Sequence, residues 1–183
     1  MRRVRALGLE GQVTVEYGDF REARGVYDKV ASIGMFEHLR PGEYPAFFAT
    51  VERLLDRRGL ALLHSIGCYS ERNEPDPFTQ KYLFPGATFP SLSAIVRQLE
   101  RRAMPILDLE NIARSYQPTT RHWLANFRAH RDSLDPARYD GRFRRMFEYY
   151  LAMCVAATHA LIGEVFQILF TRDYQRHLGF ARL

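Results

Sequence analysis

Two short segments carry the side chains of this sequence that are best suited to chemistry. One is Ile33-Gly34-Met35-Phe36-Glu37-His38, and the other is His64-Ser65-Ile66-Gly67. A carboxylate and an imidazole held close together in a partly dry cleft can share a proton, bind a small anion or orient a base. Two plainer interpretations remain open: the Glu-His pair lies in a solvated loop, or His64 is a hydrogen-bonded histidine of the core. Residue spacing alone does not choose between them.

Both segments follow stretches that the sequence pattern predicts to be strands. Residues 26–33 read Val-Tyr-Asp-Lys-Val-Ala-Ser-Ile and are followed at once by a glycine. Residues 60–66 form an apolar run, broken only by His64 and Ser65, that is typical of a strand buried on both faces of a parallel sheet. In open α/β sheets, ligands bind outside the carboxyl ends of the strands. We therefore expect the two segments to meet at one edge of a sheet, beside a pocket.

Further strands and helices alternate along the rest of the chain. A helix is expected after Pro41-Gly42, ending at Gly59, and another from a cap at Ser91 to about residue 101. Residues 119–134 and 141–163 also have helical patterns, and strands are expected at residues 13–17, 106–109 and 165–170. This order predicts one α/β domain, residues 1–183, with a mostly parallel sheet. The proline-rich stretch 69–90 is expected to be an ordered excursion that could cover a site.

Five blocks of the chain resemble the cyclopropane-fatty-acyl-phospholipid synthases and the related mycolic acid cyclopropane synthases, in the same order. They are residues 27–38, 62–67, 81–86, 121–127 and 142–151, and together they span nearly the whole chain. The resemblance implies the Rossmann-like sheet of a class I S-adenosylmethionine-dependent methyltransferase. It also implies methyl transfer from S-adenosylmethionine to a cis double bond of a phospholipid acyl chain, followed by proton loss and ring closure.

The resemblance assigns site residues as well. Members of the family keep a bicarbonate ion as the base, and Glu37, His64, Ile66 (through its backbone) and Tyr150 match the residues that hold it. Tyr149 is the alternative to Tyr150, because neighbouring tyrosines on a helix face different ways and only one can point inward. For S-adenosylmethionine, Gly18, Asp19 and Phe20 match the segment near the adenine. Ile33 and Gly34 match the backbone beside the methionine portion.

The chain also departs from the family pattern at its amino-terminal end. An earlier strand, a glycine-rich turn around the cofactor, an acidic residue for the ribose and a cysteine at the bicarbonate site find no match in the sequence. The resemblance therefore predicts an amino-terminally truncated sheet without its first two strands. Two hypotheses follow: a lipid methyltransferase, or a non-catalytic remnant that binds no cofactor by itself.

Composition limits the partners and the location. The chain has 26 basic and 21 acidic residues, a formal charge of +5 that favours anionic partners such as phospholipid headgroups or nucleic acid. Scattered arginines are typical of solvated helix faces, and nothing resembles a base-reading motif, so nucleic acid is not expected. The two cysteines, Cys68 and Cys154, have no metal-ligand spacing and predict free thiols, so no metal is expected.

No apolar run approaches the roughly 20 residues that a membrane-spanning helix needs. The two widely separated cysteines favour a reducing cytoplasm, and the resemblance implies peripheral contact with the inner membrane surface. The aromatic-rich residues 78–89 are one candidate for bilayer contact, unless they simply cover the core. A sheet edge left open by missing strands would also permit a homo-oligomer.

Overall fold

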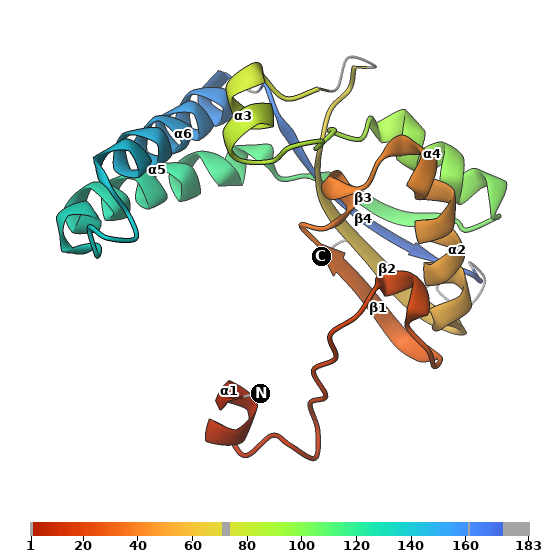
Figure 1. The fold of residues 1–183 in the computed structure, drawn as a ribbon. Helices are drawn as coiled ribbons and strands as arrows, with labels where there is room; N and C mark the ends of the chain where they lie inside the picture. The colour runs from red at the N-terminus through yellow and green to blue at the C-terminus, as the bar shows by residue number, and fades with distance from the viewer. Residues whose placement is uncertain (1, 71–73, 161, 174–183) are drawn as a thin grey trace.

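The computed structural model describes residues 2–70, 74–160 and 162–173 (Figure 1). Its strands are β1 (Tyr27–Ile33), β2 (Leu55–Gly67), β3 (Ile106–Asn111) and β4 (Glu164–Thr171). Its α-helices are α1 (Arg2–Ala6), α2 (Tyr44–Leu54), α3 (Pro77–Tyr82), α4 (Leu92–Arg101), α5 (Ala113–His130) and α6 (Gly141–Ala160). Four 3₁₀ turns complete the list: η1 (Phe20–Glu22), η2 (Phe36–His38), η3 (Pro41–Glu43) and η4 (Arg131–Ser133).

The four strands form one mixed sheet in the order β1-β2-β4-β3. β1 and β2 are parallel, whereas β4 runs antiparallel to both β2 and β3. The prediction of mostly parallel strands is right for the directions of β1, β2 and β3, and β4 is the exception. The reason is the connection: two helices, α5 and α6, leave β3 and return as a hairpin to the same end of the sheet, so the next strand must run back.

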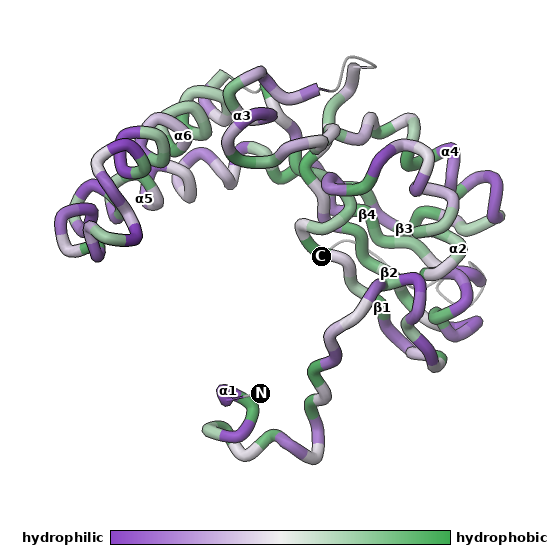
Figure 2. Tube along the Cα trace, in the orientation of Figure 1, coloured by the Kyte–Doolittle hydropathy of each residue, from purple (hydrophilic) through white to green (hydrophobic). Residues whose placement is uncertain are grey.

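Helices α2 and α4 cover one face of the sheet (Figure 1). The hydrophobic core lies between these helices and the sheet. Along β2, Ala61, Leu63 and Ser65 are buried, whereas the alternating residues Leu62 and His64 are only half-buried. This two-residue alternation follows from the pleat of a strand. Hydrophobic residues recur along the strands of the sheet (Figure 2). β2 is therefore fully buried on one face only, and His64 lies on the other face.

Several predicted boundaries change in the structure. Residues 13–17 form no strand, and the extended segment that carries them joins the sheet to α1, which lies apart from it (Figure 1). The first long helix ends at Leu54 rather than Gly59, because β2 already begins at Leu55. Gly59 lies inside β2, where a Cβ atom would be 2.8 Å from the carbonyl oxygen of Asp28. Such close backbone contact is a common reason for glycine in a strand.

Helix α5 begins six residues earlier than predicted, at Ala113 rather than Thr119. Pro118 therefore lies inside the helix, where it lacks an N–H to donate and usually ends or kinks the helix. The predicted helix at 91–101 is confirmed as α4, with the Ser91 Oγ accepting from the backbone N–H of Ala94.

Candidate active site

The carboxyl ends of β1 and β2 meet at one edge of the sheet, as predicted. Gly34 ends β1 with a φ of 64°, in the left-handed region that favours glycine, and its N–H donates to the carbonyl of His64. The chain then turns through η2. Phe36 is fully buried there against the rings of Tyr44, Phe47 and Phe48, which anchors the turn.

Anchoring of Phe36 places the neighbouring carboxylate, Glu37, inside the protein with only 6% of its surface exposed. The Ser65 Oγ donates to Glu37 Oε2 over 3.0 Å, and the serine side chain is itself completely buried. The same Oγ lies 2.9 Å from the backbone oxygen of Ile66. A hydroxyl has one proton, so the two acceptors compete for it, and a charged acceptor forms the stronger bond.

His64 lies on the half-buried face of β2, with both ring nitrogens engaged. Its Nε2 is 3.1 Å from the hydroxyl of Tyr116 at the start of α5, and its Nδ1 is 3.2 Å from Nε2 of Gln167 on β4. Burial is the main reason why the pKa of Tyr116 is raised, and the negative charge of Glu37 adds to it. That electrostatic effect ties Tyr116 to the carboxylate as well as to the imidazole.

Two hydrogen-bonded pairs therefore lie near the carboxyl end of β2: Glu37 with Ser65, and His64 with Tyr116. We refer to these four residues together as the cluster. The hydroxyl of Tyr116 can donate to a small anion, whereas the Glu37 carboxylate can accept a hydrogen bond from an O–H group. Ile66 follows on β2 on the same face as His64. Bicarbonate has one O–H to donate and further oxygens to accept, so this set of side chains fits such an ion.

The tyrosine proposed from the resemblance lies elsewhere in the hairpin. Tyr150 packs its ring against Phe84 and Phe147, and burial, followed by the nearby Cys154, raises its pKa. Tyr149 is 55% exposed and contacts Phe78. Among the described residues, the structure shows neither tyrosine hydrogen-bonded to His64 or Glu37, so a role for Tyr150 stays a prediction.

Tyr116 was missed by sequence reasoning, although a signal for it existed. It follows the carboxyl end of β3, which points to the same sheet edge as the ends of β1 and β2. The rule that ligands bind at this edge applies to all strands that end there. Applying the rule to the strand predicted at residues 106–109 would have included Tyr116.

The five residues expected near S-adenosylmethionine fall into two groups. Ile33 and Gly34 adjoin Glu37 at the carboxyl end of β1; the Ile33 side chain is 67% exposed. A Cβ on Gly34 would lie 3.8 Å from Glu37 Oε1, an ordinary contact distance, so the φ of 64° rather than lack of space favours glycine there. An exposed apolar side chain beside open backbone suits the methionine portion of the cofactor.

Gly18, Asp19 and Phe20 lie at η1, beside α2. The Asp19 carboxylate caps this turn and pairs with Arg21, which lowers the pKa of Asp19 to about 2. Phe20 contacts Phe47, whose ring also meets Phe36. A row of aromatic rings thus links this segment to the turn that carries Glu37.

The excursion between β2 and α4 approaches the site from the side of the hairpin. Phe84 contacts both His38 and Tyr150, and Phe78 contacts Tyr82 as well as Tyr149. Phe78 and Phe84 therefore pack against residues of α6, and Phe84 also packs against His38 of η2. Residues 71–73 of the excursion lie outside the described residues.

Solved structures define the class of protein. The chain resembles a mycolic acid cyclopropane synthase, CmaA1, solved with SAH and CTAB, with a TM-score of 0.74 and 24% identity over 82% of this chain and 57% of that one. It also resembles a putative sarcosine dimethylglycine methyltransferase from Galdieria sulphuraria, with a TM-score of 0.77 and 17% identity over 94% and 63% of the two chains. The α/β fold is therefore that of the class I S-adenosylmethionine-dependent methyltransferases.

Sequence comparison then defines the family. Residues 1–168 match the family described as mycolic acid cyclopropane synthetase, and the chain belongs to that family. It is 35% identical over 182 residues to the cyclopropane-fatty-acyl-phospholipid synthase of Escherichia coli (strain K12), a match that covers all of this chain and 47% of that protein. The chain thus spans about half the length of the curated relatives that it matches.

Proposed function

We propose that this chain carries the acid-base part of a cyclopropane-fatty-acyl-phospholipid synthase-like methyltransferase. The reaction transfers a methylene group from S-adenosylmethionine to the cis double bond of an unsaturated phospholipid acyl chain. The observation that supports it most directly is the cluster in which Ser65 holds Glu37 and Tyr116 meets His64. Family membership supplies the reaction class, and the cluster supplies groups that suit its proton-transfer step.

The chemistry explains why such groups stand in a partly dry site. S-adenosylmethionine supplies an electrophilic methyl group, and bicarbonate is the proposed proton acceptor. Attack by an alkene on a methyl group leaves a carbocation, which water would trap unless the site excludes it. Loss of one proton from the added methyl group then closes the ring. In this proposal Glu37, Tyr116 and the backbone of Ile66 hold the base. His64 orients the hydroxyl of Tyr116, which lies 3.1 Å from its Nε2.

Cofactor contacts are proposed for the same five residues as before. Ile33 and Gly34 border the methionine portion, and Gly18, Asp19 and Phe20 border the adenine. The free edge and the open face of β1 leave Ile33 accessible in the described part of the chain.

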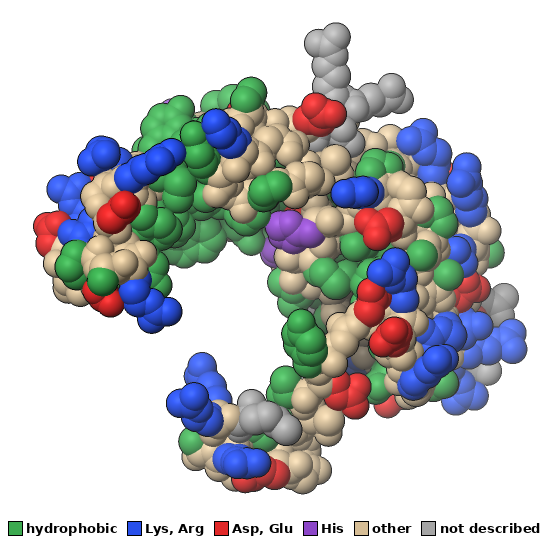
Figure 3. Space-filling view, viewed as in Figure 1, with side chains coloured by type: hydrophobic (Ala, Val, Ile, Leu, Met, Phe, Trp, Pro, Cys, Tyr) green, Lys and Arg blue, Asp and Glu red, His purple; other side chains and the backbone are tan. Residues whose placement is uncertain are grey.

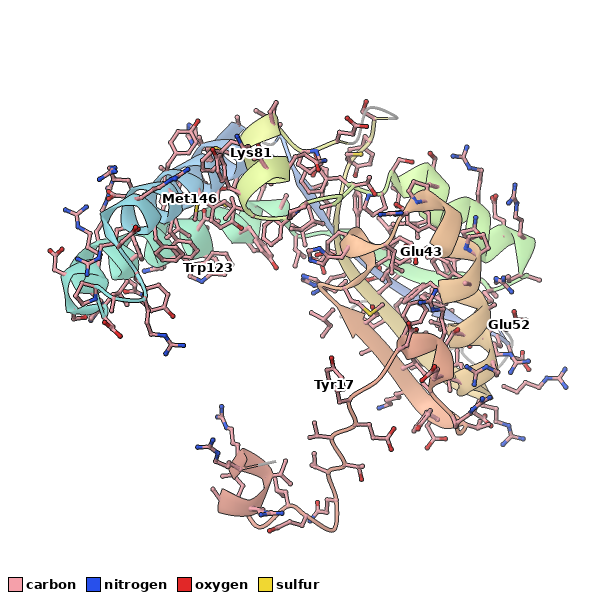
Figure 4. The ribbon with its side chains drawn as sticks, viewed as in Figure 1. Tyr17, Glu43, Glu52, Lys81, Trp123 and Met146 are labelled. Atoms are coloured by element: carbon pink, nitrogen blue, oxygen red, sulfur yellow. The ribbon has the colours of Figure 1, made fainter. Side chains whose placement is uncertain are left out.

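The acyl chain is proposed to lie along the hairpin of α5 and α6. Trp123 contacts Tyr116 through an edge-on ring pair with centroids 6.4 Å apart, and it remains 47% exposed. In Figure 4 its side chain lies on the side of α5 that borders the hollow between the hairpin and the sheet. Figure 3 shows hydrophobic side chains along the same side of the hairpin. An apolar surface that leads from Tyr116 outward suits a hydrocarbon chain.

Peripheral contact with an anionic membrane is proposed at the free end of this hairpin. Residues 121–148 contain seven arginines against four Asp and Glu residues, and Figure 3 shows Lys and Arg side chains gathered there. Charge near an anionic lipid surface contributes about 1 kcal/mol per basic residue. Among the described residues, no helix is long and apolar enough to cross a membrane.

Vesicle binding tests this membrane contact. The double charge reversal Arg142→Glu with Arg145→Glu should weaken sedimentation with vesicles of unsaturated phosphatidylglycerol. The matched control is the double variant Arg57→Glu with Arg58→Glu. These two arginines lie near the amino-terminal end of β2 and not on the hairpin. Equal loss in both variants would argue against the hairpin as the contact surface. The proposal of membrane contact includes a location at the cytoplasmic face of the inner membrane.

Self-association is proposed at β1, which pairs only with β2 among the described residues. An unpaired strand edge is a template for pairing with another chain. Sedimentation equilibrium would report a dimer if this edge pairs between copies. A monomer at all concentrations would contradict the proposal.

Calorimetric titration of the chain with S-adenosylmethionine is the first test of the proposed reaction. One-to-one binding should be followed by conversion of unsaturated phosphatidylglycerol vesicles to cyclopropane or methyl-branched chains, measured by mass spectrometry. Glu37→Gln should abolish the product, and Glu110→Gln, an exposed carboxylate on β3, should not. A folded chain that binds no cofactor would instead support the non-catalytic remnant.

A further inference from the structure

Gln167 lies directly across the sheet from His64. The two residues are partners in the antiparallel register of β2 and β4, so their side chains leave the same face of the sheet. The amide Nε2 of Gln167 lies 3.2 Å from Nδ1 of His64. Both side chains are half-buried, which limits competition from water for this bond.

The direction of this hydrogen bond decides where the imidazole carries its proton. An amide nitrogen can only donate, so Nδ1 must accept with its lone pair. A neutral imidazole with an accepting Nδ1 carries its proton on Nε2. The structure places the hydroxyl of Tyr116 3.1 Å from Nε2, so His64 donates to the phenol oxygen.

A chain of donors follows from this order. Gln167 donates to His64, His64 donates to Tyr116, and the hydroxyl proton of Tyr116 is left to point away from the imidazole. Successive hydrogen bonds polarise one another, which strengthens the last donor of the chain.

We propose that Gln167 is a positioning residue that holds His64 in the Nε2–H tautomer and thereby leaves Tyr116 as a hydrogen-bond donor in the active site. Its importance for turnover rests on the proposed function, whereas the tautomer itself does not. The surrounding titratable groups are Glu37 from η2, Tyr116 from α5 and Glu110 from β3. Glu110 is the register partner of Gln167 on its other side and is exposed.

The sharpest test replaces the donor with an acceptor of the same size. In Gln167→Glu, the carboxylate can only accept from the ring, so Nδ1 must carry a proton whether the imidazole is neutral or cationic. In Gln167→Met, the length is kept and the hydrogen bond is lost. Glu110→Gln changes a charge on the neighbouring strand without removing the bond to His64, and it is the matched control.

The measurement is the pair of ¹⁵N chemical shifts of His64 in the full 183-residue chain near neutral pH. Wild type and Glu110→Gln should show the protonated nitrogen at Nε2. Gln167→Glu should show a protonated Nδ1, and Gln167→Met should show shifts averaged between tautomers. Protonated Nδ1 in the wild type, or unchanged shifts in both Gln167 variants, would overturn the proposal.

Activity gives a separate result. If the proposed function holds, Gln167→Glu should lower methyl transfer by about 10-fold to 100-fold, the range typical of changes to partners that orient a metal-bound imidazole. If the ¹⁵N shifts of His64 change as expected but the wild-type chain transfers no methyl group, the tautomer is supported and the proposed reaction is contradicted. Full activity in Gln167→Glu with an altered tautomer would show that Gln167 does not act on the reaction.

Discussion

Removal of the Ser65 hydroxyl is expected to destabilise the protein through the carboxylate of Glu37. In Ser65→Ala, a buried carboxylate loses its 3.0 Å donor. Hydrogen bonds to charged groups contribute about 1.5–3 kcal/mol, so the free energy of unfolding should fall by about that amount. For a chain of this length, the melting temperature should fall by about 3–12 °C. Urea denaturation at pH 7 measures the change.

A double-mutant cycle with Glu37→Gln isolates the charge. The amide oxygen of glutamine can still accept from Ser65, but a neutral hydrogen bond contributes only about 0.5–1.5 kcal/mol. Ser65→Ala should therefore cost about 1 kcal/mol less when Glu37 is already glutamine. The control Ser115→Ala, at an exposed position of α5, should stay within about 0.5 kcal/mol of wild type. The same cost of Ser65→Ala in both backgrounds would refute the reasoning.

Three further outcomes are expected. Glu37→Gln should lower the pKa of Tyr116 from its wild-type position, because a neighbouring negative charge is removed, but burial should keep it above 10.0; ¹³C NMR of the tyrosine rings measures it. Gly67→Ala should destabilise the protein by about 1–3 kcal/mol in urea, since the added methyl group would meet the ring of Phe166 at 2.8 Å. Asp19 should titrate near pH 2 rather than 3.8 by NMR; its stabilising effect is complete above about 3.8 and is lost as the pH falls through 2.

Each of these outcomes has a control. Glu110→Gln should leave the pKa of Tyr116 unchanged. If both variants lower this pKa equally, the effect is not specific to Glu37. Gly18→Ala should be neutral, because nothing lies within 4 Å of its Cβ position; equal losses at both glycines would contradict the packing argument. Arg21→Ala should return the pKa of Asp19 toward its ordinary value, because the side-chain hydrogen bond from Arg21 is the largest cause of the shift.

Local patterns determined much of the fold. The strand before Gly34 was predictable from its β-branched residues and the following glycine. The start of α4 was predictable from the cap at Ser91. Each signal acts within a few residues, so it can be read without knowing the rest of the chain. The placement of Glu37 and His64 near one end of the sheet also followed, because parallel neighbours end at the same side.

Long-range contacts decided the rest. Alternating residues at 13–17 look like a strand, but a strand exists only when it finds a partner, and none appears beside them among the described residues. The reversal of β4 depended on two helices returning as a hairpin, which no short pattern encodes.

The choice between tyrosines shows the same division. The sequence by itself predicted that Glu37 and His64 lie near the same end of the sheet, because β1 and β2 are parallel neighbours. Only the tertiary structure brought Tyr116 to His64 and placed Tyr150 against Phe84, since the direction of a helix relative to the sheet decides which phenol reaches the site. Gln167 became visible for the same reason: the register of β2 and β4 is set by packing across the whole sheet.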